Sequence, residues 1–572
     1  MMKFFLTEAT FRRGLTNYLN TRAFGNAEQD DLWDFLTRAA HQDLTLDSDT
    51  TVKAIMDTWT LQMGYPLVKV MRNAGGTVAT VTQERFLLRK DPNSTDSHAY
   101  KWWVPLSYTT QPDADFTKTA PSMWLSLADS EVTVRSLPGS SEWVIFNLQE
   151  TGYYRVNYDK NNWDLLIKQL ANDHTKIHVN NRAQLIDDSL NLARAGQLSY
   201  SLPLDLIAYL TQETDYTPWA AALDNLDHMH RMFSRTGAYG ALKSYLLSLL
   251  GPLYTAVGFQ DSPTDPHLQQ FKRVKMLKWS CKLGHQDCVQ QSVSLFKQWR
   301  MNPTDKSIIS PNLRSTVYCV AIAQGGEEEW EFAWNQFLTS NVGSEKSKLL
   351  AALGCSKKIW ILSRFLEMAF TKDSGIRKQD AGRVFGSVAL NSVGTDLAWT
   401  FLRDQWRDIT KYMGSGLFTL PRLIKGVTSS MNKELQLGEL KQFQSDNAGH
   451  LGTAKRALAQ AIERTENNIE WTNKNSHEII QWLARNGYSA TLRTLLHAHL
   501  NDSPSSTQQS APTAAQTPAH GRPYTHNPTN TSVSRNEVMV ACMINTEPPL
   551  KSGSRTALSP SLDLQYNLSA AP

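Results

Sequence analysis

The chain has 572 residues, too many for one hydrophobic core, and this length predicts about three or four domains. Hydrophobic residues make up 41% and charged residues 20%, which indicates a soluble globular protein without a membrane-spanning segment. The net charge of +4 is nearly neutral for this length, so it gives no argument for a nucleic-acid partner or an acidic membrane surface.

The first 65 residues predict helices. Phe11, Leu15 and Leu19 recur at helical spacing. Gly64, directly before Tyr65 and a proline, predicts a helix stop, so the first domain should end at residue 65. The apolar run that opens the chain stops at Thr7, which is too short for the hydrophobic part of a signal peptide. We therefore expect no export signal or anchor in the chain as written.

Residues 66–160 change to the period of strands. Short β-branched and aromatic runs are separated by Gly, Pro, Asn and Asp, which predicts a small β-sandwich. The segment 73–76, Asn-Ala-Gly-Gly, predicts a hairpin turn. The expected strands lie at 67–70, 78–83, 102–106, 131–134 and 143–148.

Residues 161–490 return to a helical pattern over more than 300 positions. Paired helices in a run of this length usually stack into an α-superhelix, similar in kind to HEAT repeats. No strict sequence period is present, so we expect the repeat to be structural and degenerate.

The last segment, 491–572, is rich in Ser, Thr, Pro, Ala and Gln. Such a composition buries too little apolar surface to offset chain entropy, so we predict a disordered tail. Asn93 begins an Asn-Ser-Thr sequon in a polar loop of the predicted sandwich, and it is the candidate glycosylation residue for an exported chain.

The five cysteines allow two interpretations. Cys281 and Cys288, with His285 between them, could ligate a metal, but the spacing departs from the paired C-x2-C of zinc sites. The alternative, which we favour, is a pair of structural disulfides formed in an oxidising compartment by Cys281, Cys288, Cys319 and Cys355. Cys542 would then remain a free thiol in the tail.

The histidines do not form a helical zinc-protease site. Such a site needs two His at i and i+4 with a Glu after the first. Of the fourteen His, only His477 is followed by Glu, and the next residues are Ile479, Ile480 and Gln481, so the second ligand is missing. We therefore predict no catalytic and no metal-binding residue in this chain.

Four long ordered motifs resemble the C-terminal half of zinc aminopeptidases of the aminopeptidase N group, also called membrane alanyl aminopeptidases. The resemblance covers about residues 1–486. Its motifs are Asp57-Thr58-Trp59-Thr60-Leu61-Gln62-Met63-Gly64-Tyr65-Pro66, Thr151-Gly152-Tyr153-Tyr154-Arg155-Val156-Asn157-Tyr158-Asp159, Asn181-Arg182-Ala183-Gln184-Leu185-Ile186-Asp187-Asp188, and Asn312-Leu313-Arg314-Ser315-Thr316-Val317-Tyr318-Cys319 with Ala323-Gln324-Gly325-Gly326-Glu327-Glu328-Glu329-Trp330.

The resemblance implies a fold and a set of sites. Residues 1–65 would be the last helices of a thermolysin-like catalytic domain, followed by the β-sandwich, the helical superhelix and the tail. The helical domain would carry the disulfides Cys281–Cys288 and Cys319–Cys355. It would also close over a chamber that admits peptides, in which Arg314 or Arg182 would meet a substrate carboxylate. The alternative for both arginines is a structural ion pair with a nearby carboxylate.

The resemblance also implies an activity. A complete member is a zinc-dependent ectoenzyme of the plasma membrane or the extracellular space that removes N-terminal residues from peptides and forms homodimers through its helical domain. Its HExxH and Gly-Ala-Met-Glu-Asn segments are absent from this sequence. We therefore expect this chain alone to be inactive and to bind no zinc. The alternative is a non-catalytic peptide-binding or dimerisation module derived from the same family.

Overall fold

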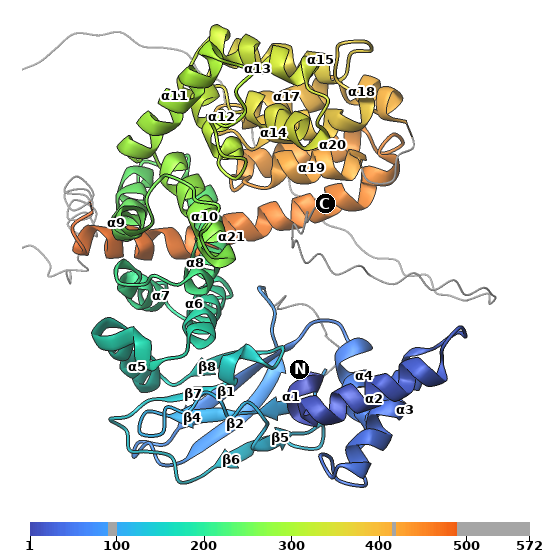
Figure 1. Ribbon diagram of the computed structural model, residues 1–572, viewed down its shortest axis with the longest axis vertical. Helices are drawn as coiled ribbons and strands as arrows, with labels where there is room; N and C mark the ends of the chain where they lie inside the picture. The colour runs from blue at the N-terminus through green and yellow to red at the C-terminus, as the bar shows by residue number, and fades with distance from the viewer. Residues whose placement is uncertain (90–99, 415–418, 489–572) are drawn as a thin grey trace, which may run out of the picture. The chain divides into compact units, whose positions relative to one another are not determined.

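The computed structural model describes residues 1–89, 100–414 and 419–488 (Figure 1). The predicted glycosylation residue Asn93, the predicted tail from 491 onward and Cys542 lie outside these ranges.

The N-terminal helices are short, and two of them begin at a threonine cap. Thr7 Oγ1 accepts a hydrogen bond from the amide of Thr10, and Thr51 Oγ1 accepts one from Ala54, so each satisfies a free amide at a helix start. The apolar faces of these helices form a small core of their own around Trp33. The bounds are α1 (Met2–Leu6), α2 (Glu8–Thr21), α3 (Gln29–Gln42) and α4 (Val52–Thr60).

The last of these helices ends earlier than the sequence suggested. Helix α4 stops at Thr60, with Leu61 as its C-cap, and not at Gly64. Gly64 instead has φ of +92°, a left-handed conformation that glycine adopts without the steric cost of a Cβ atom. It therefore turns the chain into the first strand.

The strands form small sheets. In the four-stranded sheet the order is β6-β2-β1-β8, with β1 antiparallel to β2 and parallel to β8. Val70 faces Val81 across the first pair, and both side chains are buried. The strands are β1 (Pro66–Arg72), β2 (Ala79–Arg85), β3 (Val104–Leu106), β4 (Tyr108–Thr110), β5 (Met123–Leu125), β6 (Val132–Val134), β7 (Val144–Phe146) and β8 (Arg155–Tyr158).

The turn between β1 and β2 is where the sequence placed it. The amide of Gly76 donates to the carbonyl of Asn73 at 2.9 Å, and Gly76 has φ of +78°. A Cβ atom at Gly76 would lie 2.4 Å from the backbone nitrogen of Ser140, so the turn also needs the space that glycine leaves.

The remainder of the described chain is helical. Its helices are α5 (Lys160–Asp173), α6 (Val179–Arg194), α7 (Ser201–Leu206), α8 (Tyr216–Phe233), α9 (Tyr239–Val257), α10 (His267–Lys282), α11 (Gln286–Met301), α12 (Arg314–Gln324), α13 (Glu327–Thr339), α14 (Gly343–Leu353), α15 (Ile359–Ala369), α16 (Ala381–Ala389), α17 (Thr395–Asp404), α18 (Trp406–Met413), α19 (Thr419–Thr428), α20 (Glu434–Asp446) and α21 (Lys455–Arg485). The expectation of a mainly helical chain with small sheets and a large helical part is confirmed.

The long helix α21 departs from a simple succession of neighbours. It contacts α19 and α20, which precede it, and also α7 and α9, which lie more than 200 residues earlier in the chain (Figure 1). Trp482 near its end donates from Nε1 to Asp205 at 2.7 Å. Helix α21 therefore connects the two ends of the helical part.

Candidate functional site

Two of the sequence motifs meet where the last strand leads into the helical part. Arg155 of β8 forms ion pairs with Asp187 and Asp188 of α6. Asp188 Oδ2 also accepts the backbone amide of Val156 at 3.0 Å. These residues hold strand and helix together, so their shared function in this structure is mechanical.

One carboxylate at this junction has a perturbed pKa. Asp188 is only 3% exposed, and burial raises its pKa to about 7, aided by the neighbouring Asp187 carboxylate and opposed by Arg155. The junction is therefore a pH-sensitive element of the fold.

The turn before this junction adopts an unusual backbone. Asn147 is fully buried with φ of +62°, and its side chain donates to the carbonyls of Gly152 and Tyr154. Asn181, which begins the motif Asn181 to Asp188, completes the network, because its Nδ2 donates to the Asn147 carbonyl at 3.0 Å. Asparagine tolerates the left-handed region better than most residues, and here its amide satisfies the turn.

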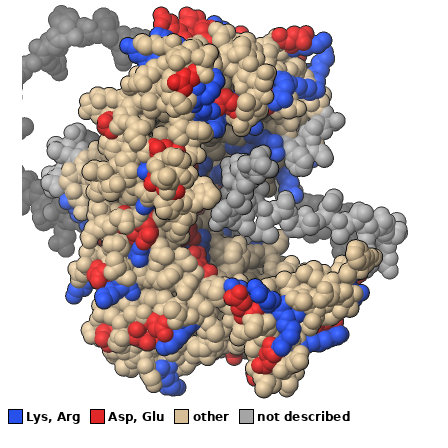
Figure 2. All heavy atoms as spheres, viewed as in Figure 1, with Lys and Arg blue, Asp and Glu red and all other residues tan. Residues whose placement is uncertain are grey.

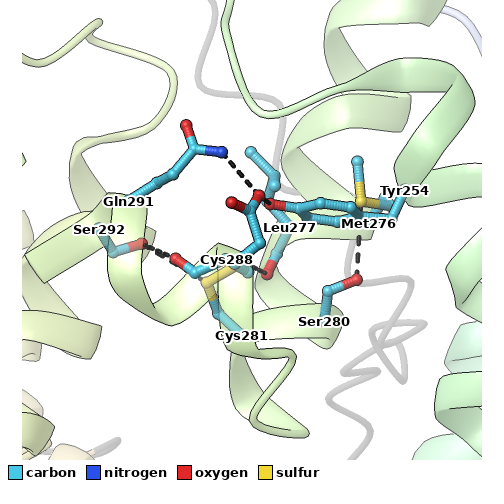
Figure 3. Close-up of a disulfide and its surroundings, with 9 residues drawn as sticks. Tyr254, Met276, Leu277, Ser280, Cys281, Cys288, Gln291 and Ser292 are labelled. Atoms are coloured by element: carbon cyan, nitrogen blue, oxygen red, sulfur yellow. Dashed lines mark hydrogen bonds between the residues drawn. A yellow bond between two sulfur atoms is a disulfide. The ribbon is translucent and has the colours of Figure 1, made fainter.

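Both disulfides implied by the resemblance are present. Cys281 at the end of α10 is bonded to Cys288 in α11, and Figure 3 shows the pair packed among Leu277, Ser280 and Ser292. Cys319 in α12 is bonded to Cys355, which follows α14. Cys281 and Cys288 are buried, so this pair acts as a structural link and is not positioned to react with an external thiol.

The two arginines proposed for a substrate carboxylate are occupied by carboxylates of the chain itself. Arg182 donates from Nε to Glu213 at 2.7 Å and from Nη2 to Asp215 at 2.7 Å, and it is only 5% exposed. Arg314 pairs with Glu345 at 3.2 Å and donates to two backbone carbonyls. This arrangement supports the structural alternative for both.

The acidic start of α13 is also paired. Glu329 accepts the amide of Gly326 at 2.8 Å, which caps the helix. Arg300 contacts Glu328 and Glu329, and Arg364 contacts Glu327. These carboxylates are therefore engaged within the fold.

No zinc site is assembled from the described residues. Within the ranges 1–89, 100–414 and 419–488, no three His, Cys, Asp or Glu side chains are placed to hold one metal ion. Glu478 is bound to Ser199 and Ser201, so its carboxylate orders the start of α7 and does not face a second histidine. The residues present do not fit the zinc of the family, and we derive no step through it.

Comparisons with known proteins agree with the resemblance that the motifs indicated. The family profile described as the ERAP1-like C-terminal domain matches residues 143–467, and the Peptidase family M1 domain matches residues 1–59. Aminopeptidase Ey of Gallus gallus is 41% identical over 495 residues, which cover 84% of this chain and 49% of the relative. Aminopeptidase N of Homo sapiens is 40% identical over 495 residues, covering 85% and 50%.

A more distant relative is similar over the same stretch. Thyrotropin-releasing hormone-degrading ectoenzyme of Mus musculus is 34% identical over 499 residues, covering 85% of this chain and 46% of the relative. The chain thus spans about half the length of the curated relatives it matches. By these matches the chain belongs to the aminopeptidase N family and carries the ERAP1-like C-terminal domain of that family.

Proposed function

We propose that this chain is the C-terminal portion of a zinc aminopeptidase that, in complete form, removes N-terminal residues from peptides, and that the chain alone does not catalyse this reaction. The proposal rests on one observation: the chain belongs to the family but lacks the HExxH motif that would bind zinc. Relatives named aminopeptidase match along 84–85% of the chain, yet the lone His477-Glu478 pair is followed by Ile479, Ile480 and Gln481.

We also propose a domain assignment for each part of the chain. Residues 1–65 would be helices of a thermolysin-like domain, since the Peptidase family M1 domain matches 1–59. Residues 66–160 would form a β-sandwich spacer. Residues 161–490 would form a HEAT-like superhelix that covers the peptide chamber, and 491–572 would be the tail.

The location of the complete enzyme is also a proposal. Two disulfides support an oxidising compartment, and hence the plasma membrane ectodomain or the extracellular space. Among the described residues, no helix combines the length and the apolar character needed to cross a bilayer.

The test uses the purified 572-residue chain with alanyl and leucyl chromogenic substrates, and elemental analysis for zinc. We expect no turnover and no stoichiometric zinc, with a full-length aminopeptidase as the positive control. A Glu478→Gln variant is the matched control, because it changes the one His-Glu pair without changing side-chain size. One zinc per chain, together with turnover that Glu478→Gln abolishes, would contradict the proposal.

A second candidate function, a non-catalytic peptide-binding or dimerisation module, is favoured by one surface. Ile359 and Trp360 at the start of α15 are 58% and 52% exposed, and Leu390 after α16 is 69% exposed. Lys357 donates to Asn391 at 3.0 Å, which places these segments side by side. Exposed apolar clusters of this kind mark interaction surfaces.

Sedimentation of the chain and of a Trp360→Glu, Leu390→Glu double variant tests this second function. A homodimer that the double variant converts to a monomer would support it. A wild-type monomer that also fails to bind a mixed peptide pool would remove it.

A further inference from the structure

The two disulfides differ in their exposure to solvent. Cys281 and Cys288 are 7% and 0% exposed, and the contacts of their sulfur atoms with neighbouring residues are buried (Figure 3). Cys319 and Cys355 are both half-buried. The Sγ atom of Cys355 lies 3.8 Å from the carbonyl oxygen of Ala351, and this contact is exposed. An external thiol can therefore reach the second bond but not the first.

The turn that carries Cys355 is held in place by hydrogen bonds that do not involve its sulfur. Asn391, which is 7% exposed, donates from Nδ2 to the carbonyl of Gly354 at 2.9 Å and to that of Ser356 at 2.6 Å. These two residues lie on either side of Cys355. The amide of Cys355 donates to the carbonyl of Ala352 at 2.8 Å. All three bonds end on backbone groups, so they can persist when the sulfur–sulfur bond is broken.

The helices on both sides of the bond are also held together by other contacts. Tyr318, next to Cys319 in α12, donates its hydroxyl to Glu345 of α14 at 2.5 Å. At the end of α14, the carbonyl of Leu353 accepts a hydrogen bond from Trp330 Nε1 at 3.2 Å. After reduction, the two thiols should therefore remain close to each other. Reacting groups that are held close react as if they were highly concentrated, so the bond should re-form readily.

The segment that follows Cys355 is positively charged. Lys357 and Lys358 come two and three residues later, and no Asp or Glu occurs within residues 346–366. Lys357 Nζ donates to Asn391 Oδ1 at 3.0 Å, and among the described residues it has no carboxylate partner. Figure 2 shows side chains of both signs over α13 and α15, so the charge at this turn is set by its own lysines. The attacking form of a thiol is its anion, which these lysines attract.

We propose that the Cys319–Cys355 bond is a reversible exchange site for a small dithiol, whereas Cys281–Cys288 stays closed in the folded chain. One thiol of the dithiol loses its proton and attacks Cys355 Sγ, which forms a mixed disulfide and releases Cys319 as a thiolate that takes up a proton. The second thiol, also deprotonated, attacks the dithiol's own sulfur in the mixed disulfide, and Cys355 leaves and is protonated. The dithiol is oxidised by two electrons to a cyclic disulfide, and the protein disulfide is reduced to two thiols.

Opening of this bond removes a covalent constraint from the helical part. The bond closes a loop with a sequence separation of 36, which contains α13 and α14. Without the constraint the unfolded chain has more conformations, so the reduced form should have a lower Tm. The exchange needs neither zinc nor a peptide, so its test is independent of the proposed aminopeptidase function.

The experiment uses the full chain with Cys542→Ser, so that only the four paired cysteines report. The folded chain is incubated with dithiothreitol and quenched at intervals with iodoacetamide, and peptide mass spectrometry measures the alkylation of each cysteine. We expect Cys319 and Cys355 to be alkylated roughly ten-fold faster or more than Cys281 and Cys288, because access limits the attack. In guanidinium chloride, where the fold is lost, the two pairs should react at similar rates.

Re-formation of the bond tests reversibility. After removal of dithiothreitol, oxidised glutathione should restore the Cys319–Cys355 bond and the initial Tm. Asn391→Ala should slow this step by roughly three-fold or more, because the turn loses two of its hydrogen bonds. Asn432→Ala, which removes a side-chain bond to the carbonyl of Met232, is the matched control and should re-form the bond at the wild-type rate.

Three outcomes would overturn the proposal. They are equal alkylation rates for the two pairs in the folded chain, earlier opening of Cys281–Cys288, and failure of Cys319–Cys355 to re-form in the chain with native Asn391. A chain that unfolds on reduction would expose both pairs together, so the comparison of rates in the folded chain also detects this case.

Discussion

Two arginine-centred regions of the helical part differ in how their charge is balanced. Arg182 is buried with two carboxylates and a backbone carbonyl around its guanidinium. Arg464 is half-buried and donates to one hydroxyl, that of Thr428, and burial together with repulsion from Arg231 lowers its pKa. The first arrangement is complete within the chain, and the second is not.

The largest effect should come from breaking the balanced region. Replacing Arg182 by Met leaves Glu213 buried without its partner, which should lower the free energy of unfolding by about 3–5 kcal/mol. Urea unfolding followed by circular dichroism measures this change. Arg403→Met, at an exposed ion pair, is the control and should cost less than about 1 kcal/mol. Similar small losses in both variants would show that the Arg182 network is not a stabilising centre.

The two disulfides allow a second comparison of stabilising interactions, because they close loops of different length. The double variant Cys319→Ser, Cys355→Ser opens a loop with a sequence separation of 36 and should cost roughly 3–4 kcal/mol in the chain-entropy model. Cys281→Ser, Cys288→Ser opens a loop with a separation of 7 and should cost about 2 kcal/mol. Thermal unfolding of the two double variants compares them. A larger loss from the shorter loop would mean that local packing, and not loop closure, sets the contribution.

The charges around Arg155 are unbalanced in the opposite sense, because its one guanidinium pairs with the two carboxylates of Asp187 and Asp188. The pKa of Asp188 is raised to about 7 in the fold, so between pH 4 and 7 this carboxyl group keeps its proton in the folded chain and loses it in the unfolded chain. The contribution of Asp188 to stability should therefore fall as pH rises through this window. Tm measured from pH 4.5 to 8 tests the direction. Burial also raises the pKa of Glu150 to about 8 and lowers the pKa of His230 to about 4, so the test is the difference between the wild type and the Asp188→Asn variant. That variant should lose part of the fall in Tm, and an unchanged slope would contradict the assignment.

The smallest effect is expected at the unbalanced region. In chloride buffer, Arg464→Met should change the free energy of unfolding by less than about 1 kcal/mol, and in the stabilising direction, because it removes a buried donor without a partner and relieves repulsion from Arg231. Urea unfolding beside Arg182→Met gives the contrast directly. A destabilisation as large as that of Arg182→Met would erase the distinction between the two regions.

The sequence predicted the parts of this molecule whose signals are local. Phe11, Leu15 and Leu19 lie in a helix as their spacing indicated, and Asn73 to Gly76 form the turn between β1 and β2. Gly64 is not the helix end that its position predicted, because α4 already ends at Thr60 with Leu61 as its C-cap. Element boundaries depend on such single-residue competition.

The disulfide pairing and the junction network needed more than local signals. Cys281, Cys288, Cys319 and Cys355 allow three pairings, and only the resemblance selected one. Arg155 and Asp188 stood in two quoted motifs, so their presence was visible but their ion pair was not. The boundaries at 65, 160 and 490 stay predictions.

The contact between His228 and Trp471 had no sequence signal. The two residues are far apart in the chain, and each has an ordinary helical neighbourhood. Packing of α8 against α21 brings residues distant in sequence into contact, as the rings of His228 and Trp471 show. Contacts of this kind depend on long-range packing, which propensity and periodicity do not encode.

Helix α21 gives the helical part a mechanical property that stacked helix pairs lack. It has 31 residues and is about 46 Å long, and it contacts α7 and α19, which are far apart in the sequence. In an open-ended stack each helix pair contacts only its neighbours, so the pairs can unfold one after another. Here α21 must lose its contacts with both α7 and α19 before either end of the helical part can unfold. Amide protons in α7 and α19 should therefore exchange with deuterium together.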